Sequence, residues 1–312
     1  MKVKRYYDIE RNVGKLNIHS LDMLVWHILK FYLNKRLPSY YQKSEIILGK
    51  SCRDFVDNEV IVSLTSFPAR MDKIYITLES LFRQTIRPDR IILWLADEQY
   101  PDKKAVEMRL KKYKKLGLEI QYCDDLRSHK KYFYTMKKYP EAIVITADDD
   151  IIYSEDMLEK LLKTYLKYPG KIVCNRAHLM TEFDGKLLPY NSWIYRAKGY
   201  TGINIMFCPT GCAGVLYPPH SLSEHVFDSD VIRELCLFAD DIWLKCMSYL
   251  KGTEVVLTEK DNPETIDIAG ANKTGLAQLN VGQDLNDKQI KAVSDYYNIE
   301  WNKKLDLKEV PK

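Results

Sequence analysis

Three consecutive aspartates, Asp148, Asp149 and Asp150, directly follow a short apolar run in the sequence AIVITADDDII. Carboxylates this close repel and raise one another's pKa, so the cluster is costly unless a cation or hydrogen-bond donors compensate. Alternate side chains of an extended chain point the same way, which would place Asp148 and Asp150 on one side. Carboxylate oxygens suit hard divalent cations. We therefore predict a Mg²⁺ or Mn²⁺ site with Asp150 and Asp148 as ligands.

Four β-rich runs alternate with helical segments from residue 60 onward. They cover residues 60–65, 91–95, 118–123 and 142–146, and their starts lie 31, 27 and 24 residues apart. This spacing is typical of βα units that form a parallel sheet. The sequence therefore predicts an α/β fold with a mostly parallel sheet flanked by helices.

The aspartates fall at the turn from the fourth run into a helix. Ser154 is a good N-cap for that helix, and Pro169-Gly170 ends it. An earlier helix is predicted between the first two runs. The apolar faces of the two helices consist of Ile74, Leu78, Leu81 and Phe82, and of Leu158, Leu161, Leu162 and Tyr165. Ligands of open α/β sheets bind at the carboxyl ends of strands, where strand order reverses, and the aspartates occupy such an end.

The loop after the first run, TSFPAR, would form the other half of this crevice if the first and fourth strands are neighbours. Its hydroxyls, on Thr65 and Ser66, and the guanidinium of Arg70 suit a nucleotide. The sequence contains no GxxxxGK[ST] or GxGxxG motif, which argues against P-loop enzymes and dinucleotide dehydrogenases. The phosphates would instead be held through the metal ion.

Charge divides the chain unevenly. Residues 1–50 hold ten Lys/Arg and four Asp/Glu, a net charge of +6, so the other 262 residues sum to −2. We predict a basic helical arm (1–50), a catalytic domain (51–260) and a C-terminal helical extension (261–312). The arm's apolar segment, residues 21–33, is too short to span a bilayer. It either lies on an anionic membrane surface, through Leu21, Leu24, Val25, Ile28 and Tyr32, or packs on the domain with a solvated basic face.

Cysteine usage indicates a reducing compartment. The seven cysteines are odd in number and scattered, mostly in apolar runs, and the N-terminal sequence lacks the apolar core of a signal peptide. We expect a cytoplasmic protein. A zinc site at Cys208 and Cys212 is not favoured because no second ligand pair accompanies them. Nucleic acid is not an expected partner, since no recognition motif accompanies the basic arm.

A glycine-bearing loop and several aromatic residues are candidates for sugar contacts. Gly211 and Gly214 would let backbone amides approach a donor sugar, or they form a plain turn. The aromatic rings of Tyr190, Trp193 and Tyr195 either stack on sugars or belong to the core. Trp243 is a further candidate for contact with an acceptor.

The order of VIVSLTSFPAR, IILWLADE, DLRSHKKYFYTMKKYP, ITADDDII and FADDIWL resembles the GT-A glycosyltransferases, specifically the family 2-like bacterial enzymes that build surface polysaccharides. The resemblance covers roughly residues 58–258. It implies a GT-A fold, Asp150 as metal ligand and Asp97 beside the base. It further implies a nucleotide and donor site formed by Thr65, Ser66, Arg70, Lys130, Lys131, Asp148, Asp149 and Gly211.

A second acidic pair, Asp240-Asp241 in ADDIWL, matches the acidic pair of that family. Inverting transfer needs a carboxylate that takes the proton of the acceptor hydroxyl while a metal stabilises the leaving diphosphate. The resemblance assigns Asp241 as this base, with Asp240 beside it. The alternative is that the pair caps the helix that follows.

The resemblance implies a metal-dependent glycosyltransferase that moves one sugar from a nucleotide sugar, most simply a UDP-sugar, to a glycan or lipid-linked acceptor. The chain lacks the QxxRW-type motif and the membrane spans of processive members, and all six histidines precede Asp241. The metal would then rest on aspartate, diphosphate and water. Two alternatives stay open: an inactive glycan-binding module of the same fold, and a different magnesium-dependent phosphotransfer enzyme. The latter usually carries its DxD after the first strand, where this chain has TSFP.

Overall fold

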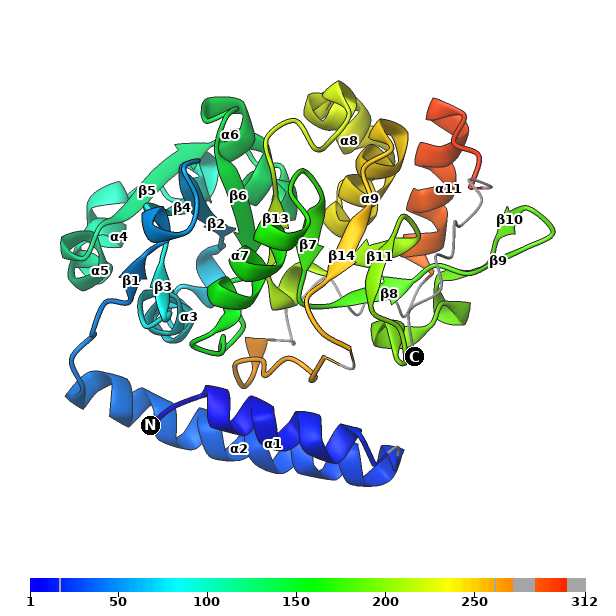
Figure 1. The fold of residues 1–312 in the computed structure, drawn as a ribbon. Helices are drawn as coiled ribbons and strands as arrows, with labels where there is room; N and C mark the ends of the chain where they lie inside the picture. Colours follow the sequence, from blue (N-terminus) through cyan, green and yellow to red (C-terminus); the bar gives the residue numbers. More distant parts are fainter. Residues whose placement is uncertain (17, 261, 272–283, 302–312) are drawn as a thin grey trace.

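A computed structural model describes residues 1–16, 18–260, 262–271 and 284–301 (Figure 1). Its centre is an eight-stranded sheet in which six strands run the same way. Strand β13 is antiparallel to both of its neighbours, and β11 is antiparallel to β14. The order across the sheet is β11 (Gly202–Asn204), β14 (Val255–Leu257), β7 (Ile172–Cys174), β13 (Val215–Tyr217), β6 (Ile143–Ala147), β2 (Val60–Thr65), β4 (Arg90–Ala96) and β5 (Leu118–Cys123). The predicted α/β fold with a mostly parallel sheet is confirmed.

Helices cover both faces of this sheet because alternate strand residues are apolar on each side. In β2, Val60, Val62 and Leu64 join the cluster beneath one set of helices, whereas Ile61 packs on the opposite face. The first face carries α3 (Ile74–Phe82), α4 (Lys103–Arg109), α5 (Lys111–Lys115) and α7 (Met157–Lys167). The second carries α6 (Lys130–Lys138), α8 (Ser229–Leu235), α9 (Asp240–Lys251) and α11 (Leu285–Tyr297).

Three small two-stranded sheets complete the strand pairing of the described residues. β1 (Lys50–Ser51) pairs with β3 (Ile86–Arg87), β8 (Ala177–Leu179) with β12 (Phe207–Pro209), and β9 (Glu182–Phe183) with β10 (Lys186–Leu187). Of the predicted C-terminal extension, residues 262–271 and 284–301 are described and contain α11; the rest of it lies outside the described residues.

The helix after the aspartates begins later than the sequence indicates. It starts at Met157 with Asp156 as N-cap, so the prediction that Ser154 caps it is wrong. The chain stays extended up to Ser154 because its backbone is bound elsewhere. The Ile152 amide donates to the carbonyl of Ile266 at 2.9 Å, and the carbonyl of Ser154 accepts from the side chain of Gln84 at 2.7 Å.

The N-terminal arm consists of α1 (Lys4–Gly14) and α2 (His19–Lys43), which lie side by side along one end of the domain (Figure 1). One face of the pair is buried against the domain: Val3, Tyr7, Leu33, Leu37 and Tyr41 pack with Ile76, Ile152, Ile266 and Ile268. The Tyr7 hydroxyl donates to the carbonyl of Ile152 at 2.7 Å. No described helix is long and apolar enough to cross a membrane.

Candidate active site

The two predicted halves of the crevice lie side by side. Strands β2 and β6 pair in parallel, with Leu64 opposite Ala147, so both chains leave the sheet at the same edge. Ser66 and Arg70 therefore reach the aspartates from the neighbouring strand. Their predicted proximity, inferred from strand order alone, is confirmed.

Asp149 and Asp150 are held by the loop that follows β2. The Ser66 hydroxyl and the Arg70 guanidinium both donate to the buried Asp149 carboxylate, and Arg70 also contacts Asp150 at 2.9 Å. Burial, helped by the charges of Asp148 and Asp149, raises the pKa of Asp150 to about 7 although Arg70 opposes the shift. Arg70 is thus the internal counter-ion of the cluster.

Asp148 is linked to the second acidic pair through Lys131. The ammonium of Lys131 lies 2.6 Å from the Asp148 carboxylate and 2.9 Å from that of Asp240. Burial disfavours the charged form of Lys131, yet the surrounding aspartates outweigh it and hold its pKa well above the ordinary value. Burial favours the neutral form of Asp240, but the charge of Lys131 outweighs the effect of burial. The pKa of Asp240 therefore lies below its ordinary value. Lys131 joins the two acidic clusters into one site.

Asp241 lies at the start of α9 beside the glycine loop. Both of its carboxylate oxygens accept from the Gly211 amide, at 3.0 and 3.2 Å. Burial and the neighbouring Asp240 raise the pKa of Asp241 to about 8. The N-cap of α9 is Ala239, and no side chain caps the helix, so the capping alternative is not observed. Both carboxylates are engaged in the site instead.

Gly211 lies close to Lys131, Asp241 and Asp148 at once. A Cβ atom there would lie 2.9 Å from the Lys131 ammonium, 3.2 Å from Asp241 and 3.4 Å from Asp148. The first distance is closer than real Cβ atoms approach. Any side chain would therefore displace the groups that the loop brings together, which explains a glycine at this position.

Three of the predicted site residues form contacts with groups other than the three aspartates. Asp97 follows β4, is half exposed and pairs with Lys103. The buried Lys130 pairs with Asp125, away from the three aspartates. The hydroxyl of Thr65 donates to the carbonyl of Trp94 at 2.8 Å, so it supports the sheet edge.

The predicted acceptor contacts need correction at two positions. Trp243 is fully buried, and its indole N–H donates to the carbonyl of Val226 at 3.2 Å. Trp193 is also buried, and its indole N–H donates to the carbonyl of Leu188 at 2.9 Å. Both belong to the main core, because burying these large rings contributes more than exposing them would. Tyr190, half buried against Trp193 at a ring separation of 4.7 Å, keeps only an edge near solvent.

Two residues that no motif indicated, Tyr153 and Arg176, support the site. The Tyr153 hydroxyl accepts from the Asp148 amide at 2.8 Å. Arg176, buried, donates to the hydroxyls of Thr210 and Tyr195, both at 2.9 Å, and so fixes the residue before Gly211. The contacts of Arg176 join segments 34 and 19 residues apart, so no local pattern could have shown them.

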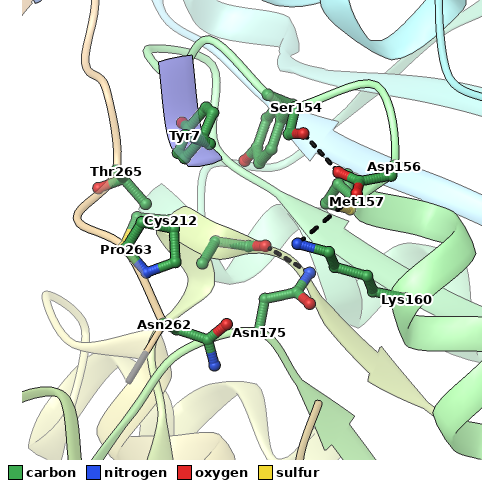
Figure 2. A pocket seen from close by; sticks show the side chains of 12 residues that line it. Tyr7, Ser154, Asp156, Met157, Lys160, Asn175, Cys212, Asn262, Pro263 and Thr265 are labelled. Atoms are coloured by element: carbon green, nitrogen blue, oxygen red, sulfur yellow. Dashed lines mark hydrogen bonds and ion pairs between the residues drawn. The ribbon is translucent and has the colours of Figure 1, made fainter. Parts of the chain in front are cut away.

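A small pocket of about 50 Å³ lies beside the glycine loop, whose Cys212 and Ala213 help to line it (Figure 2). It is lined by the arm (Tyr7), the start of α7 (Met157, Lys160) and the loop itself (Cys212, Ala213). A volume of this size has room for a few waters only, since one water needs about 10–15 Å³. The pocket is therefore too small for a sugar.

The donor set of the aspartate cluster fits a hard cation but is incomplete. Asp148 and Asp150 supply partly exposed carboxylate oxygens, with side chains 28% and 14% exposed. No group of three or more His, Cys, Asp or Glu among the described residues is arranged to hold a metal ion. Further ligands would have to come from bound phosphate and water.

No protein-family model and no curated protein matches this chain. Among solved structures the chain is similar to S. aureus TarS 1–349, at 15% identity and a TM-score of 0.42, covering 65% of this chain and 59% of that one. The same TarS fragment in complex with UDP gives 14% identity and a TM-score of 0.43, with coverages of 65% and 59%. This chain thus spans less than two thirds of the TarS fragment.

Similarity extends to a mannosyltransferase, PcManGT from Pyrobaculum calidifontis in complex with GDP-Man and Mn²⁺, at 14% identity and a TM-score of 0.31, covering 55% and 46% of the two chains. It also extends to 4-diphosphocytidyl-2C-methyl-D-erythritol synthase, at 10% identity and a TM-score of 0.40, covering 72% and 100%. All these likenesses are distant, and what the site can do follows from its own geometry.

Proposed function

We propose that this chain is a metal-dependent glycosyltransferase that moves one sugar from a nucleotide sugar, a UDP-sugar in the first instance, to a saccharide or lipid-linked acceptor with inversion. The observation that supports this best is the single site in which Lys131 bridges two acidic groups. One group, Asp148 and Asp150, offers oxygens to a divalent cation. The other contains Asp241, a carboxylate with a pKa of about 8.

Asp241 would act as the general base. A base works best when its pKa lies near the working pH, and burial has brought this carboxylate into that range. In its ionised form it takes the proton of the acceptor hydroxyl while that oxygen bonds to the anomeric carbon. The bond from that carbon to the diphosphate oxygen breaks, and the nucleoside diphosphate leaves. The Gly211 amide orients the carboxylate by donating to it.

Mn²⁺ or Mg²⁺ held by Asp148 and Asp150 would supply positive charge to the departing diphosphate. The residues of the chain do the remaining work at this end of the site. Arg70 keeps Asp149 and Asp150 in place, and Ser66 fixes Asp149 through its hydroxyl. With these contacts made before any ligand arrives, the cluster needs little reorganisation to bind one.

We further propose a cytoplasmic location and a place in bacterial surface-polysaccharide synthesis. All seven cysteines are free, and six are buried in apolar surroundings, which suits a reducing compartment. The role in polysaccharide synthesis rests on the family resemblance of the sequence and on no feature of the site.

One observation favours a second candidate, an inactive sugar-nucleotide-binding module. Lys131 and Arg70 already neutralise part of the acidic cluster, so the fold is complete without a divalent ion. Such a module would bind nucleotide without metal and would catalyse nothing.

Titration calorimetry with UDP, in the presence and absence of Mn²⁺, tests the proposal. We expect binding that requires Mn²⁺ and that Asp150→Asn abolishes, with the stability of the unliganded protein little changed because the substitution relieves repulsion. The matched control is Asp230→Asn, an exposed aspartate on α8. A panel of UDP-sugars with Mn²⁺ then identifies the donor by hydrolysis. Metal-independent binding without hydrolysis would instead establish the second candidate, and Mn²⁺-dependent binding by Asp150→Asn would overturn the ligand assignment.

A further inference from the structure

The outer face of α2 is apolar although the opposite face is already buried in the protein. Leu29, Leu33 and Leu37 pack toward the domain. On the other side Leu24, Ile28 and Phe31 are 57%, 56% and 69% exposed. They lie four and three residues apart and so form one continuous stripe. A contiguous apolar stripe exposed beside an already buried face is typical of an interaction surface, which indicates that something covers this stripe.

Positive charge surrounds the stripe. Eight of the ten basic side chains of residues 1–50 are exposed, whereas only one of the four acidic ones, Glu45, is. Glu10 and Asp22 are buried and lie 3.6 and 3.9 Å from the Arg196 guanidinium. The folded arm therefore presents an outward charge more positive than the +6 of its sequence suggests.

Cations and rings are paired along the same face. The Lys35 ammonium lies 5.9 Å from the centre of the Phe31 ring, and the Arg36 guanidinium lies 5.8 Å from that of Tyr32. Long basic side chains beside aromatic rings can keep their charge at the level of lipid phosphates while their stems and the rings lie deeper. This arrangement is typical of a helix lying in a membrane interface.

A hollow of about 580 Å³ flanks the stripe. It is lined by Met1, Tyr32, Arg36, Ser39, Tyr40, Lys43 and Ser44. Arg36 and Lys43 lie seven residues apart on α2 and bring two cations to one opening, with four hydroxyl groups between and beside them. Cations together with hydroxyl donors suit a phosphate group, whose oxygens only accept hydrogen bonds.

We propose that the outer face of α2 docks on an anionic lipid bilayer, with Leu24, Ile28 and Phe31 in the interface and a lipid phosphate headgroup in the hollow between Arg36 and Lys43. A second copy of the chain is a poorer occupant, because it would bring two strongly positive faces together. The proposal does not depend on sugar transfer, since it uses no residue of the candidate active site.

The arm is also fixed to the edge of the sheet that carries the aspartates. The Ile268 amide donates to the carbonyl of Asp150 at 2.7 Å. The residue before it, Asp267, accepts a hydrogen bond from the ammonium of Lys30 in α2 at 2.6 Å. Docking of α2 would thus hold the candidate active site at a set orientation to the bilayer, which suits an acceptor whose sugar is attached to a lipid.

Vesicle flotation of the full chain tests the proposal. The probes are vesicles of phosphatidylcholine alone and vesicles that also contain phosphatidylglycerol. We expect binding to the anionic vesicles only, weakened by salt. Lys35→Glu with Arg36→Glu should reduce partitioning at low salt by at least about 100-fold, since each unit of charge near an anionic surface changes binding about fivefold. Leu24→Ser with Ile28→Ser and Phe31→Ser should also abolish binding.

Matched changes at α4 and α5 control for general effects of charge and polarity. Met108→Ser, with a side chain 76% exposed, and Lys111→Glu with Lys115→Glu, should leave binding unchanged. Arg36→Gln with Lys43→Gln probes the headgroup hollow and should weaken binding more than Lys111→Gln with Lys115→Gln. Thermal melts confirm that each variant is folded.

Equal binding of the arm variants and the wild type, or no binding to anionic vesicles at low salt, would overturn the proposal. Sedimentation velocity tests the remaining alternative, in which a second copy of the chain covers the stripe. If the serine variant changes the oligomeric state while the wild type ignores vesicles, the stripe is an interface between copies of the chain.

Discussion

Replacing Lys131 with methionine should destabilise the protein by about 3–5 kcal/mol, the usual cost of removing one partner from a buried ion pair. Methionine keeps the apolar stem but removes the ammonium that lies 2.6 Å from Asp148 and 2.9 Å from Asp240. Asp240 is buried and would be left without its counter-ion, whereas Asp148 is partly exposed and can be hydrated. The loss should therefore come mainly from Asp240.

Thermal and urea unfolding of the unliganded protein measure this loss. With about 2.1 cal/mol/K of unfolding entropy per residue, a loss of that size lowers the melting temperature of a chain of this length by about 5–8 °C. Lys137→Met, on the exposed side of the same helix, is the matched control and should change stability by no more than about 0.5 kcal/mol.

The pH dependence of the loss identifies its cause. In the wild type the pKa of Asp240 is lowered below its ordinary value, so its ion pair stabilises the fold above about pH 4 and is lost as pH falls through the lowered pKa. In Lys131→Met the largest contribution that opposes burial is gone, so burial raises that pKa and the ionised carboxylate destabilises the fold as pH rises. The two proteins should thus differ least in acid and most near neutrality.

Lys131→Met combined with Asp240→Asn should recover much of the lost stability, because no buried charge then remains unpaired at that position. A loss below about 1 kcal/mol for Lys131→Met at neutral pH, or a double variant no more stable than the single one, would refute the reasoning. Either result would show that the ammonium is solvated and contributes little to the fold.

Two further predictions concern the base and the loop that orients it. Asp241→Asn should keep donor affinity and lower the transfer rate by at least about 100-fold, with Asp240→Asn less harmful to the chemical step; single-turnover assays compare them. Because the pKa of Asp241 is raised to about 8, ionising this buried carboxylate lowers the stability of the fold as pH rises from about 4 to 8. Asp241→Asn should therefore melt at a higher temperature than the wild type at pH 9. An unchanged melting temperature would contradict that pKa. In the wild type, kcat/KM should rise with pH through about 8 and then level, and a profile flat between pH 6 and 9 would exclude Asp241 as the base. Gly211→Ala should lower transfer strongly while Gly14→Ala, whose Cβ would make only an ordinary contact of 3.6 Å with Asp22, should not, and equal activity of the two would show that the loop yields.

Four strands of the main sheet and their parallel direction followed from the sequence because the signals are local. Two of the four predicted runs, 60–65 and 118–123, match β2 and β5 at both ends, and the other two differ from β4 and β6 by one residue at each end. Their spacing indicates βα units, and the rule for open α/β sheets places ligands at the carboxyl ends. Ser66, Arg70 and the aspartates meet at that edge because β2 and β6 are neighbours.

The rest of the site depends on tertiary contacts that no local pattern encodes. Strand β13 is three residues long and lies antiparallel between β6 and β7, and neither its direction nor its place in the sheet could be read from the sequence. Lys131 contacts both Asp148 and Asp240, which lie 17 and 109 residues further along the chain. Trp243 shows the reverse error: aromatic rings suit both sugars and cores, and only packing decides between them.

The charge balance of the site connects its stability with its proposed chemistry. Five carboxylates, those of Asp148–150, Asp240 and Asp241, face two cations, Arg70 and Lys131, so full ionisation would leave three negative charges unbalanced. Burial raises the pKa values of Asp150 and Asp241, and the neighbouring carboxylates add to the shift. A fold selected for stability alone would have replaced some of these acids with neutral residues of similar size. Their retention at one sheet edge, around a glycine whose position excludes any side chain, is therefore best explained by a ligand that brings positive charge and by a reaction that needs a base.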